Sequence, residues 1–249
     1  MKRVLVSLIP RKLFVPIKYY FNLLMGRHEI ELVRLGEIVG VPKDGDVAVD
    51  IGANLGAYSY KLSMMGFKVF AFEPNPYCVS RLISWIGNRK NVVLHTKALS
   101  NFTGSDEFYV PITNNGFSEH ALGSLRAEPS LVQTIQVDVR KLDDYNIENI
   151  KLIKIDVEGA ELGVLEGSLN TIRKNMPVII CEIEQRHHNN SINLVFEYLF
   201  NLGYAGYFIK NNKFVSIDDF DIKLDQAGNN YKDYNGQNYI NNFIFKPKA

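Results

Sequence analysis

The feature that most constrains this chain is a glycine-containing loop between an apolar strand and a helix. Residues 46–50 predict a buried strand, and residues 55–65 predict a helix that ends at Gly66. Gly52 allows a sharp turn and close approach of a ligand to the backbone, and Gly56 allows the helix start to pack near the strand. The free N–H groups of a helix start can bind a polar or anionic group. The loop therefore predicts an α/β domain with a ligand-binding crevice.

Apolar strands alternate with helical patterns along the rest of the chain, which indicates βαβ units and a parallel sheet. The further core strands are expected at residues 68–73, 92–95, 151–156, 178–184, 204–209 and 242–245, and the helices at 76–88, 161–175 and 192–202. The last strand follows a polar stretch, 218–236, that we expect to be a loop, so this strand should run antiparallel. Residues 107–110 and 134–139 predict a hairpin-like excursion.

Composition limits the class of protein and its partners. Of 249 residues, 46% are hydrophobic and 22% are charged, which is typical of an ordinary globular domain. The net charge of +1 gives no overall attraction to nucleic acid, so we expect no nucleic-acid partner. Cys78 and Cys181 fit a reducing compartment better than a disulfide scaffold. We expect a cytoplasmic protein with one domain over residues 29–249.

Residues 1–28 differ from the rest because they contain basic residues and no acid. The basic residues are Lys2, Arg3, Arg11, Lys12, Lys18 and Arg27. The apolar stretches are shorter than the ~18–20 residues of a spanning helix, and the start lacks the cleavage site of a signal peptide. We expect a basic helical extension that packs on the core. The alternative is an amphipathic segment that contacts an anionic membrane face.

A second signal for the ligand is Glu73 at the end of the second expected strand. A carboxylate about 20 residues after the glycine loop can accept hydrogen bonds from both hydroxyls of an adenosine ribose. The dinucleotide fingerprint has a glycine where Asn54 stands, and a pyrophosphate needs close backbone approach there. Asp50 and Asn54 instead offer polar groups to a methionine amine and carboxylate. These residues favour a sulfonium cofactor over a nicotinamide.

Three motifs carry a family resemblance: Asp-Ile-Gly-Ala-Asn at 50–54, Phe-Glu-Pro-Asn at 72–75 and Lys-Ile-Asp-Val-Glu-Gly-Ala-Glu at 154–161. With them the chain resembles the FkbM-type methyltransferases, and residues 98–100 and 242–247 are similar to that family as well. The resemblance covers residues 29 to 247. It implies a Rossmann-like class I methyltransferase fold, with helices on both faces of a seven-stranded, mostly parallel sheet whose last strand is antiparallel. It also implies S-adenosyl-L-methionine as methyl donor and a hydroxyl acceptor on a sugar, glycan or related natural product.

The candidate cofactor-binding residues come from the glycine loop and the ends of the next strands. They are Asp50, Gly52, Ala53, Asn54, Gly56, Glu73, Asn75 and Ala98. The candidate catalytic residues are Asp156, Glu158 and His187. Asp156 ends the fourth core strand, where strand ends face the crevice, and can bind the acceptor, orient the donor amine or act as a base. His187 is a second base candidate because imidazole titrates near neutral pH.

Two further groups have more than one interpretation. His187 and His188 can also be an exposed polar pair in a loop. Glu182 and Glu184 share a strand face, and with Asp156 and Glu158 they would form a carboxylate cluster that raises a pKa or recruits a cation. We expect no metal, because no tight ligand spacing accompanies these acids.

The leading functional hypothesis is an O-methyltransferase acting on a small-molecule or glycan acceptor. The alternatives are a nicotinamide-dependent oxidoreductase, which would need the third loop glycine, and a non-catalytic module that binds an adenosyl ligand. Residues 113–130 and 218–236 are expected to shape the acceptor pocket, since functional variety resides in such loops. Tyr231, Tyr234 and Tyr239 are candidates for stacking on a sugar.

Overall fold

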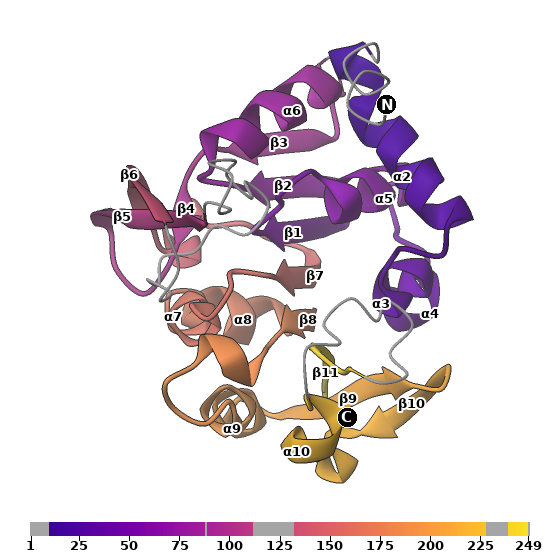
Figure 1. The fold of residues 1–249 in the computed structure, drawn as a ribbon, viewed down its shortest axis with the longest axis vertical. Helices are drawn as coiled ribbons and strands as arrows, with labels where there is room; N and C mark the ends of the chain where they lie inside the picture. The colour runs from indigo at the N-terminus through magenta and orange to yellow at the C-terminus, as the bar shows by residue number, and fades with distance from the viewer. Residues whose placement is uncertain (1–9, 88, 112–131, 228–238, 249) are drawn as a thin grey trace.

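The computed structural model of this chain describes residues 10–87, 89–111, 132–227 and 239–248 (Figure 1). Within these residues an eight-stranded sheet lies beside a separate three-stranded sheet. The main sheet contains β1 (Val47–Ile51), β2 (Lys68–Phe72), β3 (Val92–His95), β7 (Ile150–Ile155), β8 (Val178–Glu182), β9 (Tyr204–Lys210), β10 (Lys213–Ser216) and β11 (Asn242–Pro247). The small sheet contains β4 (Ala98–Leu99), β5 (Gly104–Pro111) and β6 (Val132–Arg140).

The order of strands in the main sheet is β10-β9-β11-β8-β7-β1-β2-β3. The neighbours from β3 to β8 pair in parallel, whereas β11 runs antiparallel to both β8 and β9. This confirms the mostly parallel sheet with an antiparallel last strand. Along the chain, β2 and β3 are added on one side of β1, and β7 and β8 are added on its other side. The strand order therefore reverses between β1 and β7, which is where ligands bind in open α/β sheets.

The eighth strand, β10, is an addition to the seven that were expected. It folds back on β9 with Lys213 opposite Lys210, so Asn211 and Asn212 form a two-residue turn. Both asparagines have positive φ, 50° and 61°. Asparagine tolerates this left-handed conformation better than most residues, and a turn with two such residues matches the twist of a hairpin.

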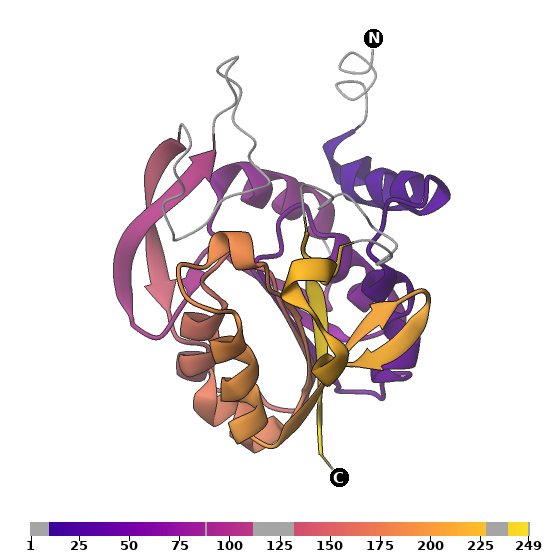
Figure 2. The ribbon, with the colours of Figure 1, turned by 60° about the horizontal axis from the view of Figure 1, so that its bottom comes forward.

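Helices cover both faces of the sheet, as expected (Figures 1 and 2). One face packs against α2 (Phe14–Leu24), α3 (Ile30–Val33), α4 (Leu35–Val39), α5 (Ala57–Met65) and α6 (Pro76–Ile86). The other packs against α7 (Glu161–Glu166), α8 (Leu169–Asn175) and α9 (Asn193–Asn201). Short helical turns are η1 (Arg11–Leu13), η2 (Leu142–Tyr145), η3 (Gln185–His187), η4 (Ile217–Asp219) and α10 (Ile222–Asp225).

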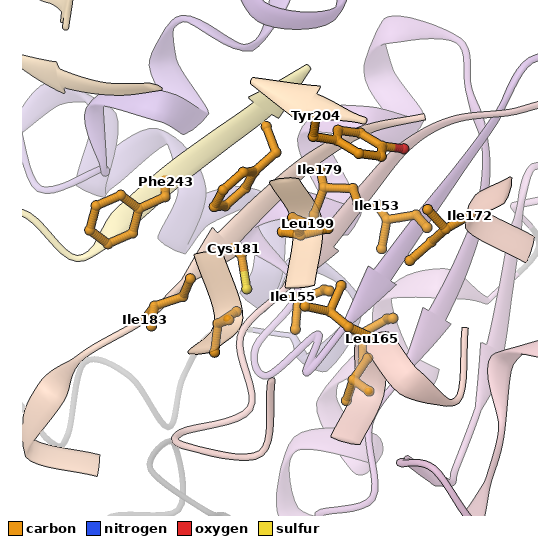
Figure 3. Close-up of a cluster of buried hydrophobic side chains, with 14 of the residues drawn as sticks. Ile153, Ile155, Leu165, Ile172, Ile179, Cys181, Ile183, Leu199, Tyr204 and Phe243 are labelled. Carbon is orange, nitrogen blue, oxygen red and sulfur yellow. The ribbon is translucent and has the colours of Figure 1, made fainter. Parts of the chain in front are cut away.

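Each face has its own apolar core because successive side chains of a strand point to opposite sides. On β7, Leu152 packs toward the α5 and α6 side, whereas Ile153 packs toward the α7 to α9 side. Figure 3 shows Ile153 close to Ile179 and Ile172 in the second of these cores. Full burial of one such side chain stabilises the fold by about 1.5–3 kcal/mol. The two cores thus hold the strand ends, and the loops that follow them, in fixed positions.

The predicted helix over 161–175 is instead two helices, α7 and α8, and the break lies at Gly167. A Cβ at Gly167 would lie only 2.0 Å from the backbone oxygen of Ser100, so the chain needs glycine there to pack. The Asp143 carboxylate then accepts a hydrogen bond from the Thr171 N–H at 2.8 Å and satisfies the start of α8. No local signal in the amphipathic pattern marks this break, because its cause is a segment that is distant in sequence.

Of the two expected loop regions, one lies outside the described residues and the other is partly described. β5 and β6 pair antiparallel, which confirms the hairpin-like excursion, but residues 113–130 lie outside the described residues. The segment expected to be loop at 218–236 contains the end of the turn η4, which begins at Ile217, and the short helix α10. Within the described residues, no helix is both long enough and apolar enough to cross a membrane. The division of the chain after residue 28 stays a prediction.

Candidate functional site

The turn after β1 is built around a contact that only glycine permits. Gly52 has φ of 76°, and a Cβ there would lie 1.8 Å from the backbone oxygen of Asp156. The end of β1 can therefore pass directly against the end of β7. The N–H groups of Gly52 and Ala53 both donate to the Phe72 carbonyl at 3.0 Å, which ties the turn to β2. The result is a fixed loop at the point where the strand order reverses.

Glu73 is held at the end of β2 by two backbone donors. Asn54, at φ 51°, donates its N–H to Oε2 at 2.7 Å, and the Asn75 N–H donates to Oε1 at 2.8 Å. The Asn75 side chain in turn accepts from the Tyr77 N–H at 3.0 Å and caps α6. Burial raises the pKa of Glu73 to about 7, although both backbone hydrogen bonds oppose this shift. Each carboxylate oxygen keeps a further lone pair that can accept from a ligand.

A cleft beside Glu73 has one apolar wall and one polar wall. Its apolar wall contains Phe72, Leu99 and Phe108, and its polar wall contains Glu73 and Asn75. The rest of its lining is Ile51, Gly52, Asn54, Pro74, Cys78, Lys97, Ala98, Asp156, Val157 and Glu158. Such a lining can hold a flat, partly apolar group together with a polar group that donates to Glu73.

A second cavity of about 330 Å³ lies next to this cleft. The two share four lining residues: Gly52, Asn54, Asp156 and Glu158. One wall of the cavity comes from the N-terminal part of the chain, namely Val15, Lys18, Tyr19, Asn22, Arg27, His28, Glu29 and Leu32. The opposite wall comes from the strand ends and α5, namely Asp50, Ala53, Leu55, Ala57, Tyr58, Lys154 and Glu182. Two ligand groups in the two spaces would therefore meet at Asp156.

Asp50 is a buried carboxyl at the end of β1. Its Oδ2 accepts a hydrogen bond from the Ser59 hydroxyl at 2.5 Å. Burial raises the pKa of Asp50 to about 6, against the opposing effects of Ser59 and Lys154. At neutral pH this carboxylate can bind an ammonium group of a ligand in the second cavity.

A buried lysine lies in the middle of the acids that were expected to cluster. Lys154 Nζ is 3.9 Å from Glu182 Oε2, and it donates to Asn242 Oδ1 at 3.1 Å. Burial alone would lower the pKa of Lys154, but Asp156, Glu29 and Glu182 raise it above its ordinary value. Burial also raises the pKa of the half-buried Asp156 to about 8, and Lys154 opposes that shift. The expected carboxylate cluster thus contains its own internal cation.

The two consecutive histidines pair with one acid in the turn between β7 and α7 and with the acid that begins α7. His187 Nε2 lies 2.7 Å from Glu158 Oε2, and His188 Nε2 lies 2.9 Å from Glu161 Oε2. Their side chains are only 8% and 7% exposed, so the interpretation as an exposed polar pair is wrong. Glu158 has a positive φ of 51°, a strained conformation that this pairing helps to hold.

Glu158, Glu184 and His187 place ligand-type atoms within 4.8 Å of one another. Glu184 already accepts hydrogen bonds from Arg186 at 2.6 Å and from the Tyr239 hydroxyl at 2.7 Å. Burial opposes ionisation of Glu184, but these donors outweigh it and hold its pKa below the ordinary value. A cation here would compete with the Arg186 guanidinium. The expectation of no metal stays a prediction.

The structure brings most of the predicted site residues together. Seven line the cleft: Gly52, Asn54, Glu73, Asn75, Ala98, Asp156 and Glu158. Asp50 and Ala53 line the second cavity. His187 joins the site through Glu158. Gly56 lines neither space; it precedes α5 with φ of 84°, and a Cβ there would lie 2.6 Å from Leu82 Cδ2.

Of the three candidates for sugar stacking, the structure describes only Tyr239 and does not support it. Tyr239 is buried, and its hydroxyl is engaged by Glu184, so its ring is not available to a ligand. Tyr231 and Tyr234 lie outside the described residues.

The sequence interpretation missed several residues that line the second cavity. Lys154 carries a signal that could have identified it, because it lies between apolar residues in a strand expected to be buried, where a lysine needs a partner. Tyr58 donates its hydroxyl to Glu29 at 2.8 Å. That contact joins α5 to the segment before α3, and neither residue carries a local signal of it. Lys18 and Asn22 reach the cavity only because α2 packs on α5 and α6.

The family model of the methyltransferase FkbM domain matches residues 50–205 of this chain. The chain is 31% identical over 160 residues to the hexuronic acid methyltransferase AglP of Haloferax volcanii, covering 63% of each protein. It is 30% identical over 148 residues to the 2-O-methyltransferase NoeI of Sinorhizobium fredii, covering 53% of this chain and 61% of that protein. The matches therefore span less than two thirds of the length of these relatives.

A solved structure has a similar fold. The methyltransferase FkbM of Methylobacillus flagellatus KT superposes with a TM-score of 0.55 and 16% sequence identity. The superposition covers 88% of this chain and 49% of that one. At this identity the likeness concerns the fold alone, and it agrees with the Rossmann-like arrangement of the main sheet.

Proposed function

The chain belongs to the FkbM methyltransferase family, and from this premise we propose that it transfers a methyl group from S-adenosyl-L-methionine to a hydroxyl of a sugar, glycan or related natural product. The observation that carries the proposal is the Glu73 carboxylate, fixed by the N–H groups of Asn54 and Asn75 at the edge of a partly apolar cleft. The relatives' names support the acceptor class, since one is called a hexuronic acid methyltransferase and another a 2-O-methyltransferase.

In this proposal the cleft would receive the adenosine part of the donor. Glu73 would accept from the two ribose hydroxyls, and Phe72, Leu99 and Phe108 would provide apolar surface for the purine. Asp50 and Asn54, which line the adjoining cavity, would bind the polar end of the methionine part. When bound, the donor supplies a methyl group that is already activated by a positively charged sulfur. The protein then has to align the acceptor, exclude water and receive a proton.

The contacts of Asn54 argue against a dinucleotide. In that fingerprint the backbone around the middle glycine approaches a pyrophosphate closely. Here the Asn54 N–H is occupied by Glu73, and the residue carries a side chain whose Oδ1 lies 3.7 Å from the Cys78 sulfur. The Asn54 N–H is therefore not available to the pyrophosphate of a nicotinamide cofactor.

Asp156 is the residue that receives the proton of the acceptor hydroxyl. It lines both spaces, and its pKa of about 8 leaves a carboxyl that exchanges protons near neutral pH. Glu158 also lines both spaces. His187 affects the reaction indirectly, because its Nε2 lies 2.7 Å from Glu158 Oε2 and holds that carboxylate in place. Lys18 and Asn22 on the opposite wall would offer hydrogen bonds to a hydroxyl-rich acceptor.

The donor assignment is tested by titration calorimetry with S-adenosylhomocysteine and, separately, with NAD. We expect heat of binding with S-adenosylhomocysteine only, and a loss of that binding in Glu73→Gln. Glu148→Gln is the matched control, because Glu148 is exposed and pairs with Lys174 away from the cleft. Binding of NAD, or equal affinities in the two variants, would refute the assignment. Mass spectrometry of candidate sugar acceptors incubated with isotopically labelled donor tests the acceptor class.

A further inference from the structure

The N-terminal helix α2 presents an apolar stripe to solvent. Residues 13, 17, 20, 21 and 24 follow the i, i+4, i+7, i+8, i+11 spacing of a single helix face. They are Leu13, the last residue of η1, and Ile17, Tyr20, Phe21 and Leu24 of α2, and all are exposed, with Leu24 at 87%. A surface helix normally turns a polar face outward, so the outward apolar stripe departs from the usual arrangement. Figure 1 shows α2 at the outer edge of the molecule, far from α10.

The opposite face of α2 accounts for its attachment to the domain. Val15 and Tyr19 are buried, and the Tyr19 ring packs on Tyr60 of α5 at 5.0 Å between centroids. Lys18 and Asn22, on this same side, line the second cavity. The helix is thus anchored by one face. Among the described residues, the Tyr20 ring contacts Tyr60 edge-on at 6.1 Å, and the rest of the outward stripe has no element packed over it.

The charges around the stripe identify what can cover it. Lys12 and Arg27, one before and one after α2, are exposed, and the Arg27 guanidinium lies 6.0 Å from the centre of the Phe21 ring. Residues 1–28 contain six basic side chains and no acid. An apolar helix face with exposed basic residues at its ends fits the boundary between acyl chains and anionic headgroups. A symmetric dimer through this face would bring like charges together.

From this stripe and these charges we propose that α2 docks the protein on an anionic membrane surface, lying in the plane of the interface. An 11-residue helix rises about 16 Å, roughly half of the ~30 Å hydrocarbon core, so it lies on the bilayer rather than crosses it. Because the inner face of α2 lines the second cavity, docking brings that cavity to the membrane, where a lipid-carried sugar is within reach. This last step rests on the proposed function, whereas membrane binding does not.

Co-sedimentation of the full chain with lipid vesicles tests the proposal in the absence of donor and acceptor. We expect binding to phosphatidylcholine vesicles enriched in phosphatidylglycerol, weaker binding to phosphatidylcholine alone, and loss of the difference at high salt. The double variant Phe21→Glu with Leu24→Glu lowers the apparent binding constant by at least about tenfold, since two large apolar side chains no longer enter the interface. Leu24 is 87% exposed and Phe21 is 51% exposed, so the unfolding temperature should change little.

A matched control is Leu224→Glu in α10, because Leu224 is 72% exposed and lies far from α2. Leu224→Glu should bind vesicles like the wild type, and Lys12→Glu should lose affinity for the anionic vesicles only. The proposal is overturned if the wild type does not bind anionic vesicles, or if Leu224→Glu loses as much affinity as the double variant. It is also overturned if sedimentation shows a dimer that the double variant dissociates. Methylation of a soluble acceptor, measured in parallel, tests the proposed function separately.

Discussion

Replacing Gly52 by alanine tests whether the contact between β1 and β7 builds the site. The residue has φ of 76°, and a left-handed conformation costs a non-glycine residue about 1–2 kcal/mol. The new Cβ would also lie 1.8 Å from the Asp156 oxygen, and relief of such overpacking costs typically about 1–3 kcal/mol. The sum is about 2–5 kcal/mol of unfolding free energy. In a chain of this size that lowers the unfolding temperature by about 4–20 °C.

Two other glycines separate the two contributions. Gly45 has φ of 84° and open space around it, so Gly45→Ala carries only the conformational cost of about 1–2 kcal/mol. Gly167 has an ordinary φ, but its Cβ would lie 2.0 Å from the Ser100 oxygen, so Gly167→Ala carries only the packing cost. Thermal unfolding of the three variants should rank Gly52→Ala as the most destabilised, by about the sum of the others.

Ligand binding provides a second measurement on the same variants. Calorimetry with S-adenosylhomocysteine at a temperature where all remain folded should show a large loss of affinity for Gly52→Ala and none for Gly45→Ala. The reasoning is refuted if Gly52→Ala is no less stable than Gly45→Ala, or if it binds the ligand like the wild type.

Three further predictions follow from the site. Glu73→Gln should weaken S-adenosylhomocysteine binding about 10- to 100-fold in calorimetry, because hydrogen bonds to a charged group contribute about 1.5–3 kcal/mol; an unchanged affinity would remove Glu73 from the donor site. Asp156→Asn should lower kcat about 10²–10⁴-fold with donor affinity retained, and normal turnover of this variant would exclude Asp156 as the proton acceptor. His187→Ala should change the pH profile of turnover, and His187→Gln should partly restore it. Burial raises the pKa values of Asp50, Glu73 and Asp156 to about 6, 7 and 8, so the native state retains protons that the unfolded state releases. The free energy of unfolding should therefore fall as pH rises from the ordinary carboxyl pKa, about 4, to about 8. Differential scanning calorimetry that shows the reverse would contradict these shifts.

Local sequence signals were sufficient for the parts of the fold that depend on neighbouring residues. The glycine loop, the strand ending at Glu73 and the strand ending at Asp156 follow from apolar runs and turn residues, and parallel strands bring their ends to one edge. The eighth strand was missed because its only signal is the short Asn211-Asn212 pair. The break at Gly167 was missed because its cause is the backbone of Ser100, which is remote in sequence.

The sequence predicted the site residues that stand at the ends of strands. It did not predict the residues that a helix distant in sequence contributes to the site. Asp50, Glu73 and Asp156 stand at strand ends and were expected. The wall formed by Lys18 and Asn22 depends on how α2 packs, and a helix with two apolar faces gives no local signal of which face is inward. Tertiary packing decides that orientation, since both faces satisfy the same periodicity.

The pairing of two adjacent histidines with the acids on either side of Gly159 limits how this chain can vary. His187 and His188 reach Glu158 and Glu161 together, so the spacing within each loop is matched to the spacing within the other. An insertion or deletion of one residue in either loop would separate both pairs at once. Related chains that keep this arrangement should therefore differ in the lengths of other loops and conserve the length of these two.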